Sequence, residues 1–347
     1  MTYKSLLNCL TLVLILPSCT GNPPNIVAVC EENKVGNYVI KWETPSRIKG
    51  KVKVYASTNP DFIPPRNPVA IADIADHRLT IVINNPTRRY YYLMVFDNRY
   101  RTKIADRKID IPGIRNLYDI GGYRLNGREK SVKWGKLYRA GEIKNLNRYA
   151  LNKLKNTGIR TIINLDAATT RKDNSLKEAG FNVIPIPMNT IGKEIYNDLE
   201  RKEIINNDSV RKSVGYMNSE FILKYKLEYK RIFEVLLDKT NYPVMFHCSS
   251  DSRCVAVVSL LALTSLGINA EPVIEDYCLN NSNSDISSPF TSRFPTNSKR
   301  AIHTYEELLN NFSKQIERDY RGVDAYLKME VGLTEENIAL LKGLLLE

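Results

Sequence analysis

A short apolar run that ends in a His-Cys pair, followed by a polar loop and an apolar helix, constrains the fold most. The run is Pro243 to His247, Cys248 follows it, and the helix is expected from Val255 to Leu266, before Gly267. A buried strand that leads through a loop into a helix is the repeating unit of α/β proteins. The N–H groups of such a loop converge at the helix N-terminus and bind anions.

The segments around this unit alternate between strands and helices. Hydrophobic periodicity and capping residues predict, in chain order, a helix at 146–156, strands at 159–165 and 182–186, a helical stretch at 209–238 and a Ser/Asn-rich loop at 280–298. Thr334 is expected to cap a final helix. We therefore predict an α/β domain over residues 112–347, with a central sheet flanked by helices.

The preceding residues show a different pattern, typical of β structure. Four runs rich in β-branched and aromatic residues, at 38–42, 51–55, 79–83 and 90–96, are separated by Asn, Pro and Gly turn signals. Short strands at this density indicate a small antiparallel sandwich of the immunoglobulin or fibronectin type III kind. We place this all-β domain at residues 25–111.

The first residues have the features of a targeting segment. Lys4 precedes the apolar stretch Leu10 to Leu16, which is too short to span a membrane. The segment ends in Leu-Pro-Ser-Cys, similar to a bacterial lipoprotein signal, so residues 1–18 would be removed and Cys19 acylated. Residues 19–24 would then be a spacer. We expect a lipid-anchored protein of the bacterial cell envelope; the alternative is a plain secretory signal with an incidental cysteine.

Composition narrows the classes of partner. Hydrophobic residues make up 43% of the chain and charged residues 25%, which is typical of globular protein. The net charge of +12 favours anionic partners, or else reflects a solvated basic surface. Lysines and arginines are scattered, so no nucleic-acid partner is expected. The cysteines that follow the signal, Cys30, Cys248, Cys254 and Cys278, do not have zinc-site spacing, and no metal or organic cofactor is expected.

A cysteine at the base of an anion-binding loop has a defined chemistry. The positive field of the loop favours the thiolate. The thiolate attacks phosphorus and forms a covalent intermediate. An arginine holds two phosphate oxygens through the transition state, and a separate aspartic acid protonates the leaving oxygen. Such a site therefore needs a cysteine, an arginine and an aspartate around one loop.

Six stretches occur in an order that carries a family resemblance. They are NLYDIGGY at 116–123, WGKLYRAGE at 134–142, GIRTIINL at 158–165, YPVMFHC at 242–248, EDYCLNN at 275–281 and GLTEEN at 332–337. Residues 114–347 thus resemble the bacterial tyrosine phosphatase family, which includes dual-specificity and phosphoinositide phosphatases. The resemblance implies phosphomonoester hydrolysis through a phosphocysteine at Cys248, and a phosphorylated protein or phospho-ligand as partner.

The active-site loop departs from the family pattern His-Cys-Thr-Ala-Gly-Lys-Asp-Arg-Thr-Gly. His247 and Cys248 match, whereas Cys254 stands in the place of the essential arginine. The phosphate-binding positions implied by the resemblance are Ser249, Ser250, Asp251, Ser252 and Cys254. A deletion would instead bring Arg253 into the arginine position. The spacing to the downstream family motifs argues against that alignment.

Two other signatures are altered. The family's Asp-Leu-Arg becomes Asn164-Leu165-Asp166, and Asn164 cannot act as the general acid. The family's Arg-Asp-Leu-Gly-Gly begins here with Tyr118-Asp119, which removes one positive charge. We expect Asp119 and His247 to support the fold and the loop rather than the chemistry.

Three functional hypotheses remain open at this point. The first is a pseudophosphatase that binds a phosphorylated or anionic ligand, or a protein partner, without turnover. The second is an active phosphatase in which Arg253 replaces the lost arginine. The third is a surface lipoprotein whose β domain carries the function. In an exported protein, Cys248 and Cys254 could also form a disulfide that blocks the nucleophile.

Overall fold

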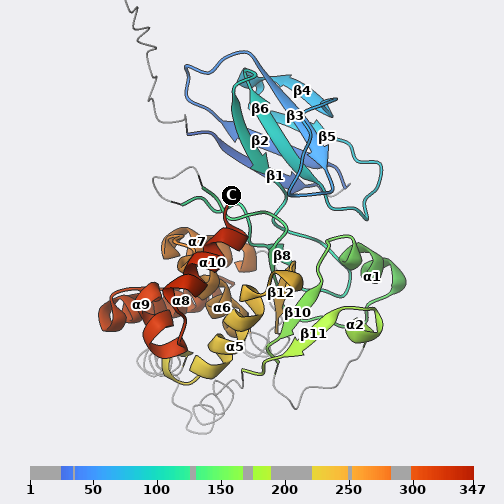
Figure 1. Cartoon of the computed structure of the whole chain (residues 1–347). Coiled ribbons are helices and arrows are strands. Elements are labelled where there is room, and N and C mark those ends of the chain that lie inside the picture. Colours follow the sequence, from blue (N-terminus) through green and yellow to red (C-terminus); the bar gives the residue numbers. More distant parts are fainter. Residues whose placement is uncertain are drawn as a thin grey trace, which may run out of the picture.

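The computed structural model describes residues 25–33, 36–125, 130–166, 175–188, 221–248, 252–282 and 298–347, with the side chains of 252, 279–282 and 298–305 left aside. Two antiparallel sheets form from the strands up to Ile104, and a mixed α/β part follows (Figure 1). The first sheet has the order β1 (Val27–Glu32), β2 (Tyr38–Glu43), β5 (Arg78–Ile81); the second has the order β4 (Ala70–Asp73), β3 (Lys51–Ser57), β6 (Tyr91–Phe96), β7 (Tyr100–Ile104).

Alternating side chains hold these two sheets together. The inward residues of β2, β3 and β6, among them Ile40, Val54 and Met94, are fully buried and belong to one core. The four runs predicted as strands correspond to β2, β3, β5 and β6. The sequence did not predict β1, β4 and β7, and each of these is an edge strand. An edge strand is half solvated, so its apolar pattern is weaker.

The α/β part is built on a five-stranded sheet of order β11-β10-β12-β9-β8. The strands are β8 (Tyr118–Asp119), β9 (Leu137–Ala140), β10 (Thr161–Asn164), β11 (Asn182–Pro185) and β12 (Val244–His247). Only the β8–β9 pair is antiparallel. The described helices are α1 (Arg148–Lys155), α2 (Ser175–Glu178), α5 (Lys226–Leu237), α6 (Ser252–Ser265), α7 (Ala270–Ser282), α8 (Ser298–Tyr320), α9 (Val323–Tyr326) and α10 (Glu335–Leu345), with short turns η1 (Ile74–Asp76), η2 (Lys239–Asn241) and η3 (Leu327–Val331).

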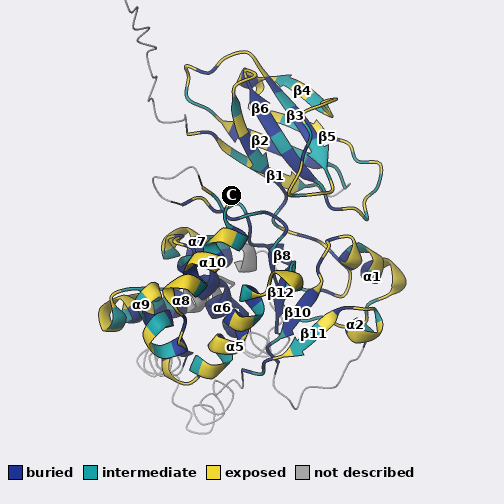
Figure 2. Ribbon diagram, viewed as in Figure 1, coloured by how far each residue is buried: buried dark blue, intermediate teal, exposed yellow. Residues whose placement is uncertain are grey.

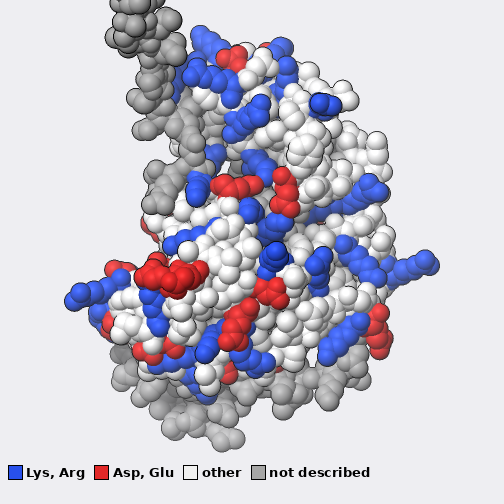
Figure 3. Space-filling model, viewed as in Figure 1, with Lys and Arg blue, Asp and Glu red and all other residues white. Residues whose placement is uncertain are grey.

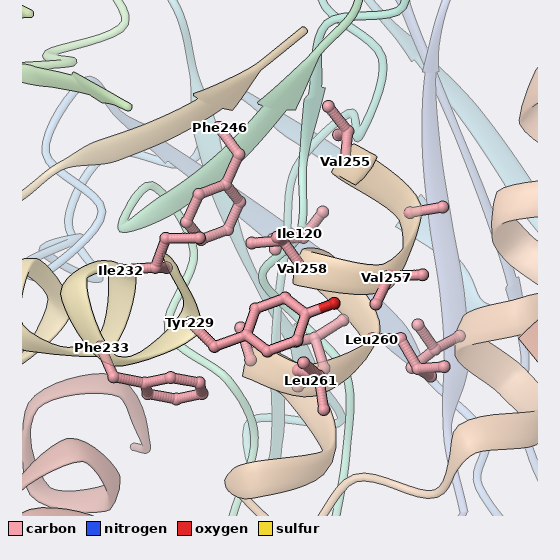
Figure 4. Close-up of a cluster of buried hydrophobic side chains, with 14 of the residues drawn as sticks. Ile120, Tyr229, Ile232, Phe233, Phe246, Val255, Val257, Val258, Leu260 and Leu261 are labelled. Carbon is pink, nitrogen blue, oxygen red and sulfur yellow. The ribbon is translucent and has the colours of Figure 1, made fainter. Parts of the chain in front are cut away.

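Helices cover both faces of this sheet, as the sequence predicted. α1 and α2 pack on one face, over a core that includes Ile162 and Met245. The other helices pack on the opposite face, where α6 is buried nearly all round (Figure 2). Figure 4 shows Tyr229 of α5 packed with Phe246 of β12 and with Val258 of α6. A helix that is apolar on all sides must be central, and α6 supports the strand that carries Cys248.

Some predicted boundaries are corrected by the structure. α6 begins at Ser252 rather than Val255, so the residues just before the apolar run already belong to the helix. α7 continues to Ser282, so the first three residues of the loop predicted at 280–298 belong to this helix. The helical stretch predicted at 209–238 contains α5, and its part before residue 221 lies outside the described residues. Thr334 caps α10 as predicted, since its side chain accepts a hydrogen bond from Asn337 N–H.

A buried ion pair joins the two parts of the chain. Arg89, just before β6, donates from Nη2 to Asp119 Oδ2 at 2.8 Å, and their side chains are 6% and 0% exposed. The same guanidinium donates to the Asp106 carbonyl and to the Tyr91 hydroxyl. Asp119 in turn accepts the Gly121 and Gly135 N–H groups at 2.9 Å. The buried cation of Arg89 in the β part and the buried anion of Asp119 in the α/β part therefore neutralise each other.

Further contacts close the same junction. They are the hydroxyl pair Tyr91–Tyr138 at 3.1 Å, the Trp134 indole to the Lys103 carbonyl at 3.3 Å, and the ion pairs Lys136–Asp61 at 2.7 Å and Lys103–Glu347 at 2.6 Å. A Cβ at Gly135 would lie 2.5 Å from the Tyr91 hydroxyl, so only glycine allows this approach. The predicted boundary between residues 111 and 112 stays a prediction.

The surface carries charges of both signs. Figure 3 shows basic side chains over both parts of the visible face, with acidic side chains among them. Within the described part of the chain, none of the helices is both long and apolar enough to cross a membrane.

Candidate active site at Cys248

Strand pairing places Cys248 beside the end of β10. β10 and β12 are parallel neighbours, with Asn164 opposite His247. Just beyond the strands, Leu165 N–H donates to the His247 carbonyl at 2.9 Å. Because parallel strands end at one edge of the sheet, the residues that follow them meet there. Asp166 and Cys248 are thus brought together from distant parts of the sequence.

The Cys248 thiol contacts a carboxylate. Its Sγ donates to Asp166 Oδ1 at 3.4 Å. Cys248 is 2% exposed and Asp166 is 8% exposed, so little solvent separates or screens them. In this contact the thiol is the hydrogen-bond donor, whereas the nucleophile of a cysteine phosphatase must be the thiolate, which can only accept.

The His247 ring is fixed between a carbonyl and the same carboxylate. Nδ1 lies 2.9 Å from the Gly141 carbonyl oxygen, which only accepts, so this nitrogen carries hydrogen. Nε2 lies 3.5 Å from Asp166 Oδ2. The ring therefore lies between the Gly141 carbonyl and the Asp166 carboxylate, whose other oxygen accepts from the Cys248 thiol.

Asn164 serves the backbone of the following turn. Its Oδ1 accepts the Asp166 N–H at 2.8 Å, which is the hydrogen bond of an Asx turn. This bond turns the chain so that the Asp166 side chain comes over the end of β12. The residue at the general-acid position is thus an amide engaged in local structure.

Cys254 lies in the first turn of α6 and points into the core. It is 0% exposed, and its Sγ donates to the Met188 carbonyl at 3.9 Å. This placement favours a packing role over the phosphate-binding role assigned from the resemblance. Cys248 and Cys254 are free thiols in the structure, so the disulfide suggested by the sequence is not formed. Arg253 lies in the same turn and is half-buried.

Several predicted site residues cannot be placed. Ser249, Ser250 and Asp251 lie outside the described residues, as does Cys19. Ser252 begins α6, but its side chain lies outside the part of the chain that the structure describes. The assignments for these residues remain predictions from the sequence.

Asp119 lies at the junction with the β sheets, bound to Arg89, Gly121 and Gly135. These contacts are an ion pair and two backbone hydrogen bonds, and the supporting role expected for Asp119 stays a prediction. Sequence reasoning missed Arg89 as the source of its counter-charge, and it missed Asp166 as a neighbour of Cys248. The sequence did offer one sign of the contact with Cys248: Asp166 stands where the family has an arginine.

Comparison with known proteins identifies the family of the α/β part. The sequence model of the tyrosine phosphatase family matches residues 109–347, and the chain belongs to this family. The core catalytic domain of the PP-IP phosphatase SIW14 from S. cerevisiae is similar over 60% of this chain and 96% of its own length, at 10% identity and a TM-score of 0.32. A putative phosphatase from Shewanella putrefaciens is similar over 58% and 94%, at 15% identity and a TM-score of 0.23. No curated protein matches. Because these structural scores are low, the family assignment rests on the sequence match.

Proposed function

We propose that the chain is a catalytically impaired tyrosine phosphatase, a pseudophosphatase that binds a phosphorylated protein or another phospho-ligand without turning it over. The observation that carries the proposal is the contact between the Cys248 thiol and the Asp166 carboxylate. A thiol held as a donor to a carboxylate is the opposite of a thiolate held in a positive field. The family supplies phosphoester hydrolysis as its general activity, and this chain departs from it at the reacting atoms.

The other substitutions act in the same direction. Cys254 stands in the arginine position with its side chain in the core. By analogy with an oxyanion donor, loss of the arginine costs about 3–4 kcal/mol of transition-state stabilisation. Loss of the acid at Asn164 costs about a further 10²–10⁴ in rate. Together these losses leave binding as the function that the site supports best.

We further propose that Cys19 is lipidated, so the protein is anchored in the cell envelope, and that the two antiparallel sheets form a domain of the immunoglobulin or fibronectin type III kind. Two acyl chains would give stable membrane attachment. Cys19→Ala should move the protein from the membrane fraction to the soluble fraction. Unchanged fractionation, with no lipid found by mass spectrometry, would rule out the anchor.

Hydrolysis of an aryl phosphate tests the impaired activity. Wild type should show little or no turnover, and Cys248→Ser should not lower it further. Cys278→Ser is the matched control, because Cys278 is another buried thiol, carried by α7 rather than by the loop after β12. Brisk wild-type turnover that Cys248→Ser abolishes would overturn the proposal and make Arg253 the substitute arginine.

Restoration of the family residues tests the reasoning from the other side. Cys254→Arg alone should not give turnover, because residues that act as a unit are strongly non-additive. Turnover should require Asn164→Asp, Asp251→Gly and Asp166→Arg in addition. Full activity from the single Cys254→Arg variant would show that the other replacements are immaterial.

A further inference from the structure

Asp166 is in hydrogen-bond contact with Cys248, and three structural features bring its carboxylate to the thiol. The parallel pairing of β10 with β12 brings the two chain segments together. The Asx turn at Asn164 directs Asp166 toward β12. His247, fixed by the Gly141 carbonyl, then meets the second carboxylate oxygen. The carboxylate is thus held on both oxygens by neighbouring residues.

The position of this carboxylate excludes a substitute general acid. In phosphoryl transfer the nucleophile and the leaving oxygen lie in line on opposite sides of phosphorus. The acid must therefore stand beyond the phosphorus atom, away from the sulfur. Asp166 Oδ1 instead contacts the sulfur atom itself, 3.4 Å from Cys248 Sγ. A phosphate group in contact with this thiol would have to share the space beside Sγ with the carboxylate.

We propose that Asp166 is an intramolecular occupant of the anion site at Cys248. Its carboxylate takes the place beside the thiol that a phosphate group requires, so a phospho-ligand reaches Cys248 only by displacing it. The inference rests on the proposed function, since it concerns how a phospho-ligand is admitted to that site. In this role Asp166 lowers the affinity of the site for a phospho-ligand. The arginine that the family has at this position would attract the phosphate instead.

Binding of tungstate, an unreactive oxyanion of phosphate shape, tests the proposal on the full chain. We expect Asp166→Ala to bind tungstate more tightly than wild type by about tenfold or more in calorimetric titration, because one adjacent negative charge and its bulk are removed. Asp319→Ala is the matched control. Asp319 is on α8, paired with its neighbour Arg318, and its loss changes the net charge equally. Equal affinity of Asp166→Ala and wild type would overturn the proposal.

A second measurement covers the case in which Asp166→Ala does not fold. Iodoacetate and iodoacetamide compete for the thiols, and the labels at Cys248 are counted by peptide mass spectrometry, with Cys30 and Cys278 as internal references. Wild type should favour the neutral reagent at Cys248. Asp166→Asn should raise the ratio of iodoacetate to iodoacetamide labels at Cys248 by about tenfold. The same ratio at Cys30 and Cys278 should not change. An unchanged ratio would also overturn the proposal.

The two proposals fail in different ways. Cys248-dependent turnover by wild type would end the pseudophosphatase proposal. An inactive wild type, in which changes at Asp166 alter neither tungstate affinity nor the labelling ratio, would end only the role of Asp166.

Discussion

Replacing Arg89 by methionine should destabilise the protein far more than the loss of an ordinary ion pair. The guanidinium is 6% exposed and donates to Asp119, the Asp106 carbonyl and the Tyr91 hydroxyl. Arg89→Met would leave the fully buried Asp119 without its cation. Removal of one partner from a buried pair costs about 3–5 kcal/mol, most of it from the uncompensated charge.

The chain provides a matched control and natural probes. Lys41–Glu31 is an ion pair of similar length, 2.9 Å, but its side chains are 54% and 61% exposed. Lys41→Met should therefore cost no more than about 1 kcal/mol. The two tryptophans lie on either side of the junction, Trp42 in β2 and Trp134 just before β9. Urea unfolding followed by tryptophan fluorescence reports both parts.

The double variant Arg89→Met/Asp119→Asn sharpens the measurement. It removes both charges, so part of the loss should be recovered, with a coupling of about 0.5–3 kcal/mol between the two sites. If Arg89→Met lowers the unfolding free energy no more than Lys41→Met, the buried pair does not hold the junction and the reasoning is wrong.

Three further predictions concern stability. Burial raises the pKa of Asp106 from 3.8 to about 6. The protonated carboxyl therefore stabilises the folded state fully below pH ~4, and this stabilisation is lost as pH rises through about 6. The unfolding free energy should fall by about 3 kcal/mol across that window. Urea titrations across that window should show the slope in wild type and not in Asp106→Asn. Thr334→Ala should cost about 1 kcal/mol by loss of the α10 cap, measured by the same unfolding assay against an exposed control such as Lys314→Ala. Phe246→Ala, at a 0% exposed site under α6, should cost about 3–5 kcal/mol, and a loss below 1 kcal/mol would mean that this core is not packed as described.

Local patterns accounted for much of the fold. The central strands β2 and β3 alternate between buried and more exposed residues, and β6 is a continuous apolar run buried on both faces, so all three have a strong pattern. The strands that escaped prediction, β1, β4 and β7, are all edge strands with several exposed residues, although the edge strand β5 was predicted from its β-branched run. The cap at Thr334 was visible because capping depends on neighbouring residues alone.

The candidate site was predictable only where it is local. The run from β12 to Cys248 and α6 could be placed from its own sequence. The contact between Cys248 and Asp166 joins residues 82 positions apart and depends on which strands pair. The sequence likewise showed a positive charge missing beside Asp119, but the compensating Arg89 comes from another sheet. Such pairings are set by tertiary structure, which short motifs do not record.

Because of the ion pair between Arg89 and Asp119, the segment that matches the family is shorter than the segment that should be expressed for folding. The family match begins at residue 109, after Arg89, yet Asp119 within it is neutralised from before that point. A recombinant fragment that begins at residue 109 would lack the cation that pairs with Asp119, so a failure of that fragment to fold would not report on the intact protein. A chimaera that joins residues 109–347 to the N-terminal part of a relative must therefore keep an arginine at the position of Arg89, or carry the substitution Tyr118→Arg.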